Sequence, residues 1–204
     1  MSRLTEHTRS SKRPYTLRER ARSQEATRRR IAEAALKLHS TVGPTATTIS
    51  AVAELAGVER LTVYRHFPDQ DALFTGCSSL HFERDPPPDP ASWQSIRHPE
   101  QRLRTALGEL FAYNRRNPRL LANLRRDLDA LPALVAKRLA SASSGSAEVL
   151  MDGWGARGSK RRRLRAVLRH AVEYETWRSV VQDGGLTDAE AIELMVGLVR
   201  LAVR

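Results

Sequence analysis

Two short helical patterns that meet at Gly57 constrain the fold of this 204-residue chain more than any other feature. The first pattern opens at Thr47 and Thr48. Apolar residues then follow at the i, i+3, i+4 and i+7 spacing of a helix: Ile49, Val52, Ala53 and Ala56. Gly57 ends this helix after about two turns. A second helix is predicted over residues 59–66, after a turn too short to let the chain travel. Two short helices joined tightly through glycine are typical of a helix-turn-helix.

The second of these helices carries polar and basic side chains on an otherwise apolar segment. Val58, Val63 and Phe67 are expected on its buried side, because residues 63 and 67 are i, i+4 neighbours. The side chains that then project elsewhere are Arg60, Leu61, Thr62, Arg65 and His66. A helix that packs one face and presents the other in this way can enter a DNA major groove.

The rest of the chain is also predicted to be helical. One helix starts at Ser23 and carries a stripe of Ile31, Ala34, Ala35, Leu38 and Val42. Another covers residues 69–82. Three consecutive prolines then make residues 85–92 a linker, because proline cannot continue a helix. Further helices start near Pro99, Pro118 and Pro132 and cover residues 160–182 and 187–203.

These patterns predict an all-α fold of about nine helices, without a convincing strand. The expected parts are a disordered arm (1–22), a helix-turn-helix domain with a linking helix (23–84), a Pro-rich loop (85–98) and a second helical domain (99–204). The last helix is apolar almost all round. Such a helix must be buried in the core or against another subunit.

The charge balance is strongly basic, with 34 Lys and Arg against 23 Asp and Glu, a formal net charge of +11. This balance suggests a polyanionic partner. Residues 1–30 hold ten basic residues and three Glu. Beside a DNA-binding fold, the basic arm over residues 1–22 is expected to add phosphate or minor-groove contacts.

Patterns that would indicate an enzyme or a metalloprotein are missing from the sequence. Cys77 is the single cysteine, and the six histidines show no metal-ligand spacing, so we predict no catalytic residue, metal or cofactor. Residues 153–158 fit G-x-G-x-x-G, but helical sequence precedes them, which indicates a loop. Seven basic residues within 157–169 are interpreted as a solvated face. No apolar run approaches the roughly 18 residues of a membrane helix, and we predict a cytoplasmic protein.

Residues 23–73 resemble the TetR (tetracycline repressor) family of transcriptional regulators. The resemblance depends on Thr47-Thr48, on the segment AELAGV (53–58), on the segment VYRHFP (63–68) and on Leu73-Phe74 in register. It implies that the helix over residues 59–66 enters the major groove. It also implies a second domain (99–204) that binds a small-molecule effector and forms a homodimer through its last two helices.

The resemblance implies a role for each matching residue of the helix-turn-helix. Thr48 is expected to contact a phosphate at a helix N-terminus. Arg60, Leu61 and Thr62 occupy base-facing positions, where Arg suits guanine and Leu61 a thymine methyl. Tyr64 and His66 resemble the family's phosphate-contacting pair, and Arg65 is expected to be solvated or to face a phosphate. Two alternatives stay open: Leu61 as a core residue, and Tyr64 as a ring that only packs.

Two departures from the family pattern affect the expected contacts. Glu59 stands where a capping Ser is common, so either the helix is poorly capped or Glu59 accepts from a cytosine amino group. Gln70 and Asp71 follow Pro68 where a Lys commonly contacts the DNA backbone. Contact with DNA is therefore expected to depend more on the arm.

The predicted function is a sequence-specific regulator, most often a repressor in such families, that leaves a palindromic operator when an effector binds. Aromatic and ionisable residues of the second domain are the candidate effector contacts: Phe111, Tyr113, Trp154, His170, Tyr174 and Trp177. Two other classes stay open. One is a nonspecific nucleic-acid-binding protein, and the other is a helical ligand-binding protein or enzyme with a relic helix-turn-helix.

Overall fold

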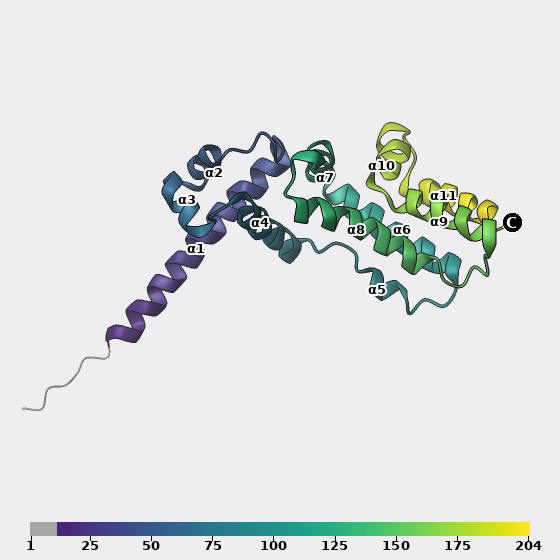
Figure 1. Cartoon of the computed structure of the whole chain (residues 1–204), viewed down its shortest axis with the longest axis horizontal. Coiled ribbons are helices and arrows are strands. Elements are labelled where there is room, and N and C mark those ends of the chain that lie inside the picture. The colour runs from purple at the N-terminus through teal and green to yellow at the C-terminus, as the bar shows by residue number, and fades with distance from the viewer. Residues whose placement is uncertain (1–11) are drawn as a thin grey trace, which may run out of the picture.

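The computed structural model describes residues 12–204, and the regular secondary structure of this part of the chain is all helical, without strands (Figure 1). The helices are α1 (Lys12–Thr41), α2 (Ile49–Ala56), α3 (Arg60–His66), α4 (Gln70–Arg84), α5 (Pro90–Trp93), α6 (Pro99–Arg116), α7 (Pro118–Arg126), α8 (Ala133–Leu150), α9 (Gly158–Val172), α10 (Tyr174–Trp177) and α11 (Asp188–Val203). A 3₁₀ turn covers Leu128–Ala130 and a π-helical segment covers Arg178–Asp183. The all-α prediction is confirmed, and the two single-turn helices α5 and α10 raise the number above the nine expected.

The buried side chains form two separate clusters. The first joins α1 to α4 and includes Ile31, Val52, Val63 and Phe67, each at most 1% exposed. The second joins α5, α6, α8, α9, α10 and α11, with Trp93 and Trp177 among its largest side chains. The helix-turn-helix thus has a core of its own, and the remaining helices form an elongated bundle beside it (Figure 1).

The first helix differs from its prediction, because α1 begins at Lys12 rather than at Ser23. Residues 12–22, expected in a disordered arm, are therefore helical, and residues 1–11 of that arm lie outside the described range. Residues 18–24 are solvent-exposed along α1, so they carry no apolar stripe by which the sequence could reveal a helix. Val42, expected on the buried stripe, is 46% exposed because α1 ends at Thr41.

The helix expected over residues 160–182 is interrupted. Glu173 adopts extended backbone angles (φ −72°, ψ 141°), and the hydroxyl of Thr176 donates to the His170 carbonyl at 2.5 Å. A hydroxyl that binds a nearby carbonyl competes with helical hydrogen bonding. The break also buries Tyr174 and Trp177 together with the end of α9, which one continuous helical face cannot do.

The Pro-rich segment 85–98 contains one helical turn. Asp89 caps α5 by accepting from the Ala91 N–H at 2.9 Å, and Trp93 is 1% exposed. The indole N–H of Trp93 donates to Glu109 Oε2 at 2.7 Å, which anchors the segment on α6. Within residues 12–204, no helix is both long and apolar enough to cross a membrane.

Candidate nucleic-acid interface

The turn between α2 and α3 is fixed by its two ends. Thr48 caps α2, because its Oγ1 accepts from the Ala51 N–H at 3.1 Å. Gly57 adopts the left-handed conformation (φ 64°, ψ 43°), and its N–H donates to the Glu54 carbonyl at 3.1 Å. Glycine adopts this conformation without the cost that a Cβ imposes. The chain therefore enters α3 three residues later, at Arg60, in a fixed direction.

Two buried side chains fix helix α3 on the core, and a basic side chain caps its C-terminal end. Val63 and Phe67 are buried in the α1–α4 core, as predicted, and Val58 packs against its edge. The Arg28 guanidinium carbon lies 4.3 Å from the centre of the Phe67 ring, and Arg28 Nη1 donates to the His66 carbonyl at 2.7 Å. A cation stacked on a ring while it caps a helix C-terminus stabilises the orientation of α3.

The outward face of α3 carries the residues expected to contact DNA. Leu61 is 72% exposed and Tyr64 44%, and Arg60 and Arg65 are also exposed. This exposure excludes the alternative in which Leu61 belongs to the core. Thr62 and His66 are half-buried at the edges of this face. Because Arg60 and Arg65 form no ion pair within residues 12–204, their charge is available to an anionic partner.

The start of α3 and the start of α4 show how the two sequence departures are accommodated. Glu59 occupies the N-cap position of α3 but makes no side-chain capping bond, so its exposed carboxylate is left for another contact. Asp69 caps α4 by accepting from the Ala72 N–H at 2.7 Å. Gln70 is exposed. No cation stands at these α4 positions to meet a phosphate.

The helix-turn-helix is tied to the second domain at the end of α1. Asn123 Nδ2 donates to the His39 carbonyl at 2.9 Å, and Arg126 Nη2 donates to the Val42 carbonyl at 3.0 Å. The buried carboxylate of Asp127 accepts from the Thr45 N–H at 3.0 Å, directly before α2. Hydrogen bonds from Arg126 and Thr45 lower the pKa of Asp127 to about 2. These contacts could not be predicted from the sequence, because the residues belong to no motif.

A second connection joins the end of α4 to α6 and α7. Asp85 accepts from Arg116 Nη2 at 2.8 Å and from Asn117 Nδ2 at 2.6 Å, and these partners lower its pKa. His81 Nε2 lies 3.0 Å from the Tyr113 hydroxyl, and burial raises the pKa of Tyr113 to about 12. The helix-turn-helix therefore contacts the second domain at two places, the C-terminal end of α7 and the junction of α6 and α7.

The six candidate effector residues do not surround a single cavity. Phe111, Tyr113, Tyr174 and Trp177 are buried core residues, Trp154 is half-buried and His170 is exposed. Several of their polar atoms are already satisfied: Trp154 Nε1 donates to the Leu150 carbonyl at 2.8 Å and the Tyr174 hydroxyl to the Pro118 carbonyl at 3.3 Å.

One small hollow lies instead between the two domains. Its walls include His39, Thr48, Phe74 and Pro132, and its volume is about 40 Å³. Ligand pockets usually have roughly 300–1,000 Å³, so this hollow is far too small for an effector.

The chemistry-bearing residues outside the interface have structural environments. Burial raises the pKa of the Cys77 thiol to about 12 and lowers the pKa of His39 to about 4, and the two side chains lie 3.5 Å apart. Within the described part of the chain, no group of His, Cys, Asp and Glu is arranged to hold a metal ion. Gly153 and Gly155 in the loop after α8, and Gly158 at the start of α9, all have positive φ, which confirms that the G-x-G-x-x-G pattern is a turn between helices.

A helix-turn-helix with an exposed, basic second helix, joined to a larger helical domain, is the architecture of a helical DNA-binding regulator. Comparison with known proteins agrees with this class. Residues 31–77 match the family model for bacterial regulatory proteins of the tetR family. A comparison with curated proteins found no match.

A similar solved structure is that of a TetR transcriptional regulator from Rhodococcus sp. RHA1. The two chains are 18% identical, the match covers 89% of this chain and 97% of that one, and the TM-score is 0.50. This likeness shows a shared fold across both domains. Residues 31–77 thus carry the sequence signature of the tetR family of bacterial regulatory proteins. The chain's fold is that of a DNA-binding transcriptional regulator.

Proposed function

We propose that this protein is a homodimeric, cytoplasmic transcriptional repressor that binds a palindromic operator and leaves it when a small molecule binds the second domain. The observation that carries the proposal is the outward face of α3. There Arg60 and the 72% exposed Leu61 stand on a helix fixed by buried Val63 and Phe67. A rigid helix with exposed Arg and apolar side chains can read guanine and thymine in the major groove.

Dimer formation is supported by an uncovered apolar stripe on α11. Leu194, Leu198 and Leu201 are 44%, 37% and 60% exposed and follow the i, i+4, i+7 spacing of one helical face. A shallow hollow runs along this stripe, and a Cβ added to Gly197 would meet nothing within 4 Å. Exposed apolar patches of this kind mark interaction sites. A second copy of α11 would bury the stripe and place two α3 helices for half-sites roughly 34 Å apart.

Effector release requires that a ligand favour one arrangement of the two domains over the other. Both interdomain connections involve α6 or α7, so a shift of these helices would be transmitted to the helix-turn-helix. A ligand that separated the Tyr174 and Trp177 rings, which lie 5.7 Å apart, would move the start of α7, because the Tyr174 hydroxyl donates to the Pro118 carbonyl. The irregular backbone at Glu173 and the π-helical segment after α10 favour this region as the effector site, because π-helical turns are frequent at functional sites.

The first experiment is selection of random duplex DNA by the purified protein at about 150 mM salt, where weak nonspecific binding is screened. An enriched palindrome is the expected result. Arg60→Ala should then lose roughly 1–3 kcal/mol of preference at one base pair per half-site. Arg119→Ala removes an exposed charge from α7 and serves as the matched control. Binding without any enriched sequence would refute a sequence-specific repressor.

The dimer is tested separately by sedimentation. Leu194→Glu with Leu201→Glu should convert the dimer to a monomer, because two charges would be buried in the apolar stripe. Phe82→Glu, at a 46% exposed apolar residue of α4, is the control and should leave the mass unchanged. A dimer that survives the double substitution would place the interface elsewhere.

A further inference from the structure

The excess positive charge of the chain is concentrated in two segments. Residues 1–30 carry ten basic and three acidic residues, and residues 157–169 carry seven basic residues and no acid. All other residues together hold 17 basic and 20 acidic side chains and are slightly acidic. The second segment, here called the distal basic cluster, consists of Arg157, Lys160, Arg161, Arg162, Arg163, Arg165 and Arg169. These two segments therefore account for the whole basic character of the protein.

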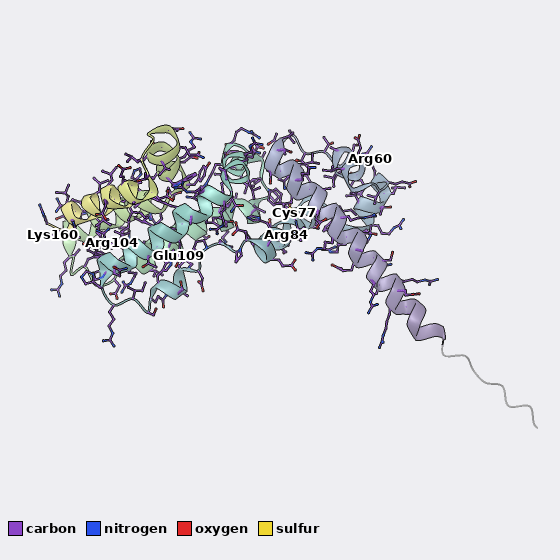
Figure 2. The ribbon with its side chains drawn as sticks, turned by 180° about the vertical axis from the view of Figure 1, so that it is seen from behind. Arg60, Cys77, Arg84, Arg104, Glu109 and Lys160 are labelled. Atoms are coloured by element: carbon purple, nitrogen blue, oxygen red, sulfur yellow. The ribbon has the colours of Figure 1, made fainter. Side chains whose placement is uncertain are left out.

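The distal basic cluster is remote from the helix-turn-helix. Figure 2 shows Lys160 and Arg60 at opposite ends of the molecule. The cluster belongs to the loop before α9 and to the first three turns of that helix. DNA held by α3 lies beyond one end of the protomer, so these seven charges cannot contribute to that contact from the same protomer.

The charges of the cluster face solvent. Six of the seven residues are exposed, and only the half-buried Arg165 has an acidic partner, with its Nε 2.9 Å from Glu148 Oε1. The other six form no ion pair with any residue in 12–204. Leu164 and Leu168 bury the opposite side of α9. Arg162 and Arg169 consequently lie on the outward side, about 10.5 Å apart along the axis.

This arrangement is unfavourable for the isolated protein. Four cations, residues 160–163, occupy the first two turns of α9, where the helix dipole is positive and favours anions. The Arg157 N-cap makes no side-chain bond that would offset this repulsion. An anionic partner bound at this end of α9 would offset both the repulsion among the cations and their unfavourable interaction with the helix dipole. A solvated face, as interpreted from the sequence, would not require this placement.

The composition of the cluster indicates which anion it fits. Six of its seven cations are arginines, whose planar guanidinium binds phosphate through two parallel hydrogen bonds. The cluster has no exposed large apolar side chain, whereas helices that lie on membranes insert such residues. The cluster extends along the exposed side of α9, which suits a repeated phosphate backbone better than a compact ligand.

We propose that the distal basic cluster binds the phosphate backbone of a second DNA duplex, independent of its sequence. The protein would then bridge two duplexes, one at α3 and the other at α9. Contacts limited to phosphates make this second binding strongly salt-dependent. Three such contacts would lower its affinity about 40-fold between 50 and 200 mM salt.

The test uses the full-length protein, a duplex fixed to beads and a fluorescent duplex of unrelated sequence at about 50 mM salt. Wild-type protein should carry the fluorescent duplex onto the beads. The variant with Arg161, Arg162 and Arg163 changed to Gln should carry at least tenfold less. The matched control removes the same charge from exposed residues outside the cluster through three substitutions: Arg97→Gln, Arg119→Gln and Lys137→Gln. It should bridge as the wild type does.

Two further measurements separate the outcomes. Thermal unfolding should show that the cluster variant folds at least as stably as the wild type. Its affinity for the selected operator at 150 mM salt should stay within about twofold, because that binding reports on α3. Loss of operator binding by all proteins would refute the proposed function rather than the bridge.

Three results would overturn the bridge itself. One is undiminished bridging by the cluster variant, which would assign bridging to the two α3 helices of a dimer. Another is no bridging by the wild type while operator binding is intact. The third is absence of bridging together with Arg-dependent sedimentation on phosphatidylserine vesicles, which would assign the cluster to anionic membranes.

Discussion

Replacement of Asp127 by Asn tests whether the contact between α7 and the loop before α2 stabilises the fold. The Asp127 carboxylate is bound by the Thr45 N–H at 3.0 Å and by Arg126 Nε at 2.7 Å, which lowers its pKa from 3.8 to about 2. One pKa unit corresponds to about 1.4 kcal/mol, so ionised Asp127 contributes at most roughly 2.5 kcal/mol. Because the Arg126 side chain is 56% exposed and its charge is screened, we expect about 1–2 kcal/mol.

The assay is urea unfolding of the wild type and Asp127→Asn at pH 7 and at pH 3. The pKa of Asp127 is lower in the folded protein than in the unfolded chain. Its stabilisation is therefore complete well above pH 4 and is lost as the pH falls toward 2. The free-energy difference between the two proteins should be about 1–2 kcal/mol at pH 7 and about half of that at pH 3.

The control for this experiment is Asp129→Asn, the same chemical change two residues further along. Asp129 is exposed and forms no ion pair in the described range, so its replacement should alter the free energy of unfolding by less than about 0.5 kcal/mol. Equal losses for the two variants, or a loss at Asp127 that does not depend on pH, would show that the carboxylate does not stabilise the interdomain contact.

Three further perturbations have definite expected results. Gly43→Ala should lower the free energy of unfolding by more than about 1 kcal/mol, because Gly43 has φ +95° and a Cβ would lie 2.0 Å from Arg126 Nη2. Gly108→Ala, within α6 and in open space, should raise the free energy of unfolding by about 0.5–1 kcal/mol, and urea unfolding compares the two variants. Cys77 should react with a thiol reagent only as fast as the protein unfolds, since its thiol is 2% exposed with a pKa of about 12; rapid labelling of the folded protein would contradict this. Tyr64→Phe should weaken binding to every duplex by the same factor, about five- to tenfold, as loss of one phosphate hydrogen bond would; a changed base preference in the duplex selection would refute that role.

The helix-turn-helix was predictable from the sequence because every local signal agreed. Thr48 caps α2, Gly57 makes the turn, and the spacing of Val63 and Phe67 fixes which side of α3 is buried. The exposed set on α3 then follows by exclusion, which is why Leu61 and Arg60 were assigned correctly to the outer face. Agreement of capping, turn and periodicity is the condition under which a short sequence specifies its structure.

The rest could not be predicted, for physical reasons that differ between elements. The first turns of α1 are solvated on all sides, so hydrophobic periodicity could not reveal them. The break at Glu173 depends on tertiary burial of Tyr174 and Trp177 rather than on a proline or glycine. The interdomain bonds of Asp127 join residues 82 positions apart, and such long-range pairs leave no local pattern.

The same long-range bonds give the proposed repressor a mechanical basis. Helix α1 packs against α2 and α4 within the helix-turn-helix and against α7 at its far end, where Asn123 and Asp127 hold it and the following loop. A displacement of α7 must therefore either break these buried bonds or carry the end of α1 with it. Leaving a buried polar group unpaired costs about 1–3 kcal/mol. Moving the whole helix-turn-helix together with α7 avoids this cost and is therefore the less costly response. An effector that shifts α6 and α7 would thus change the spacing of the two α3 helices in a dimer without contacting either one.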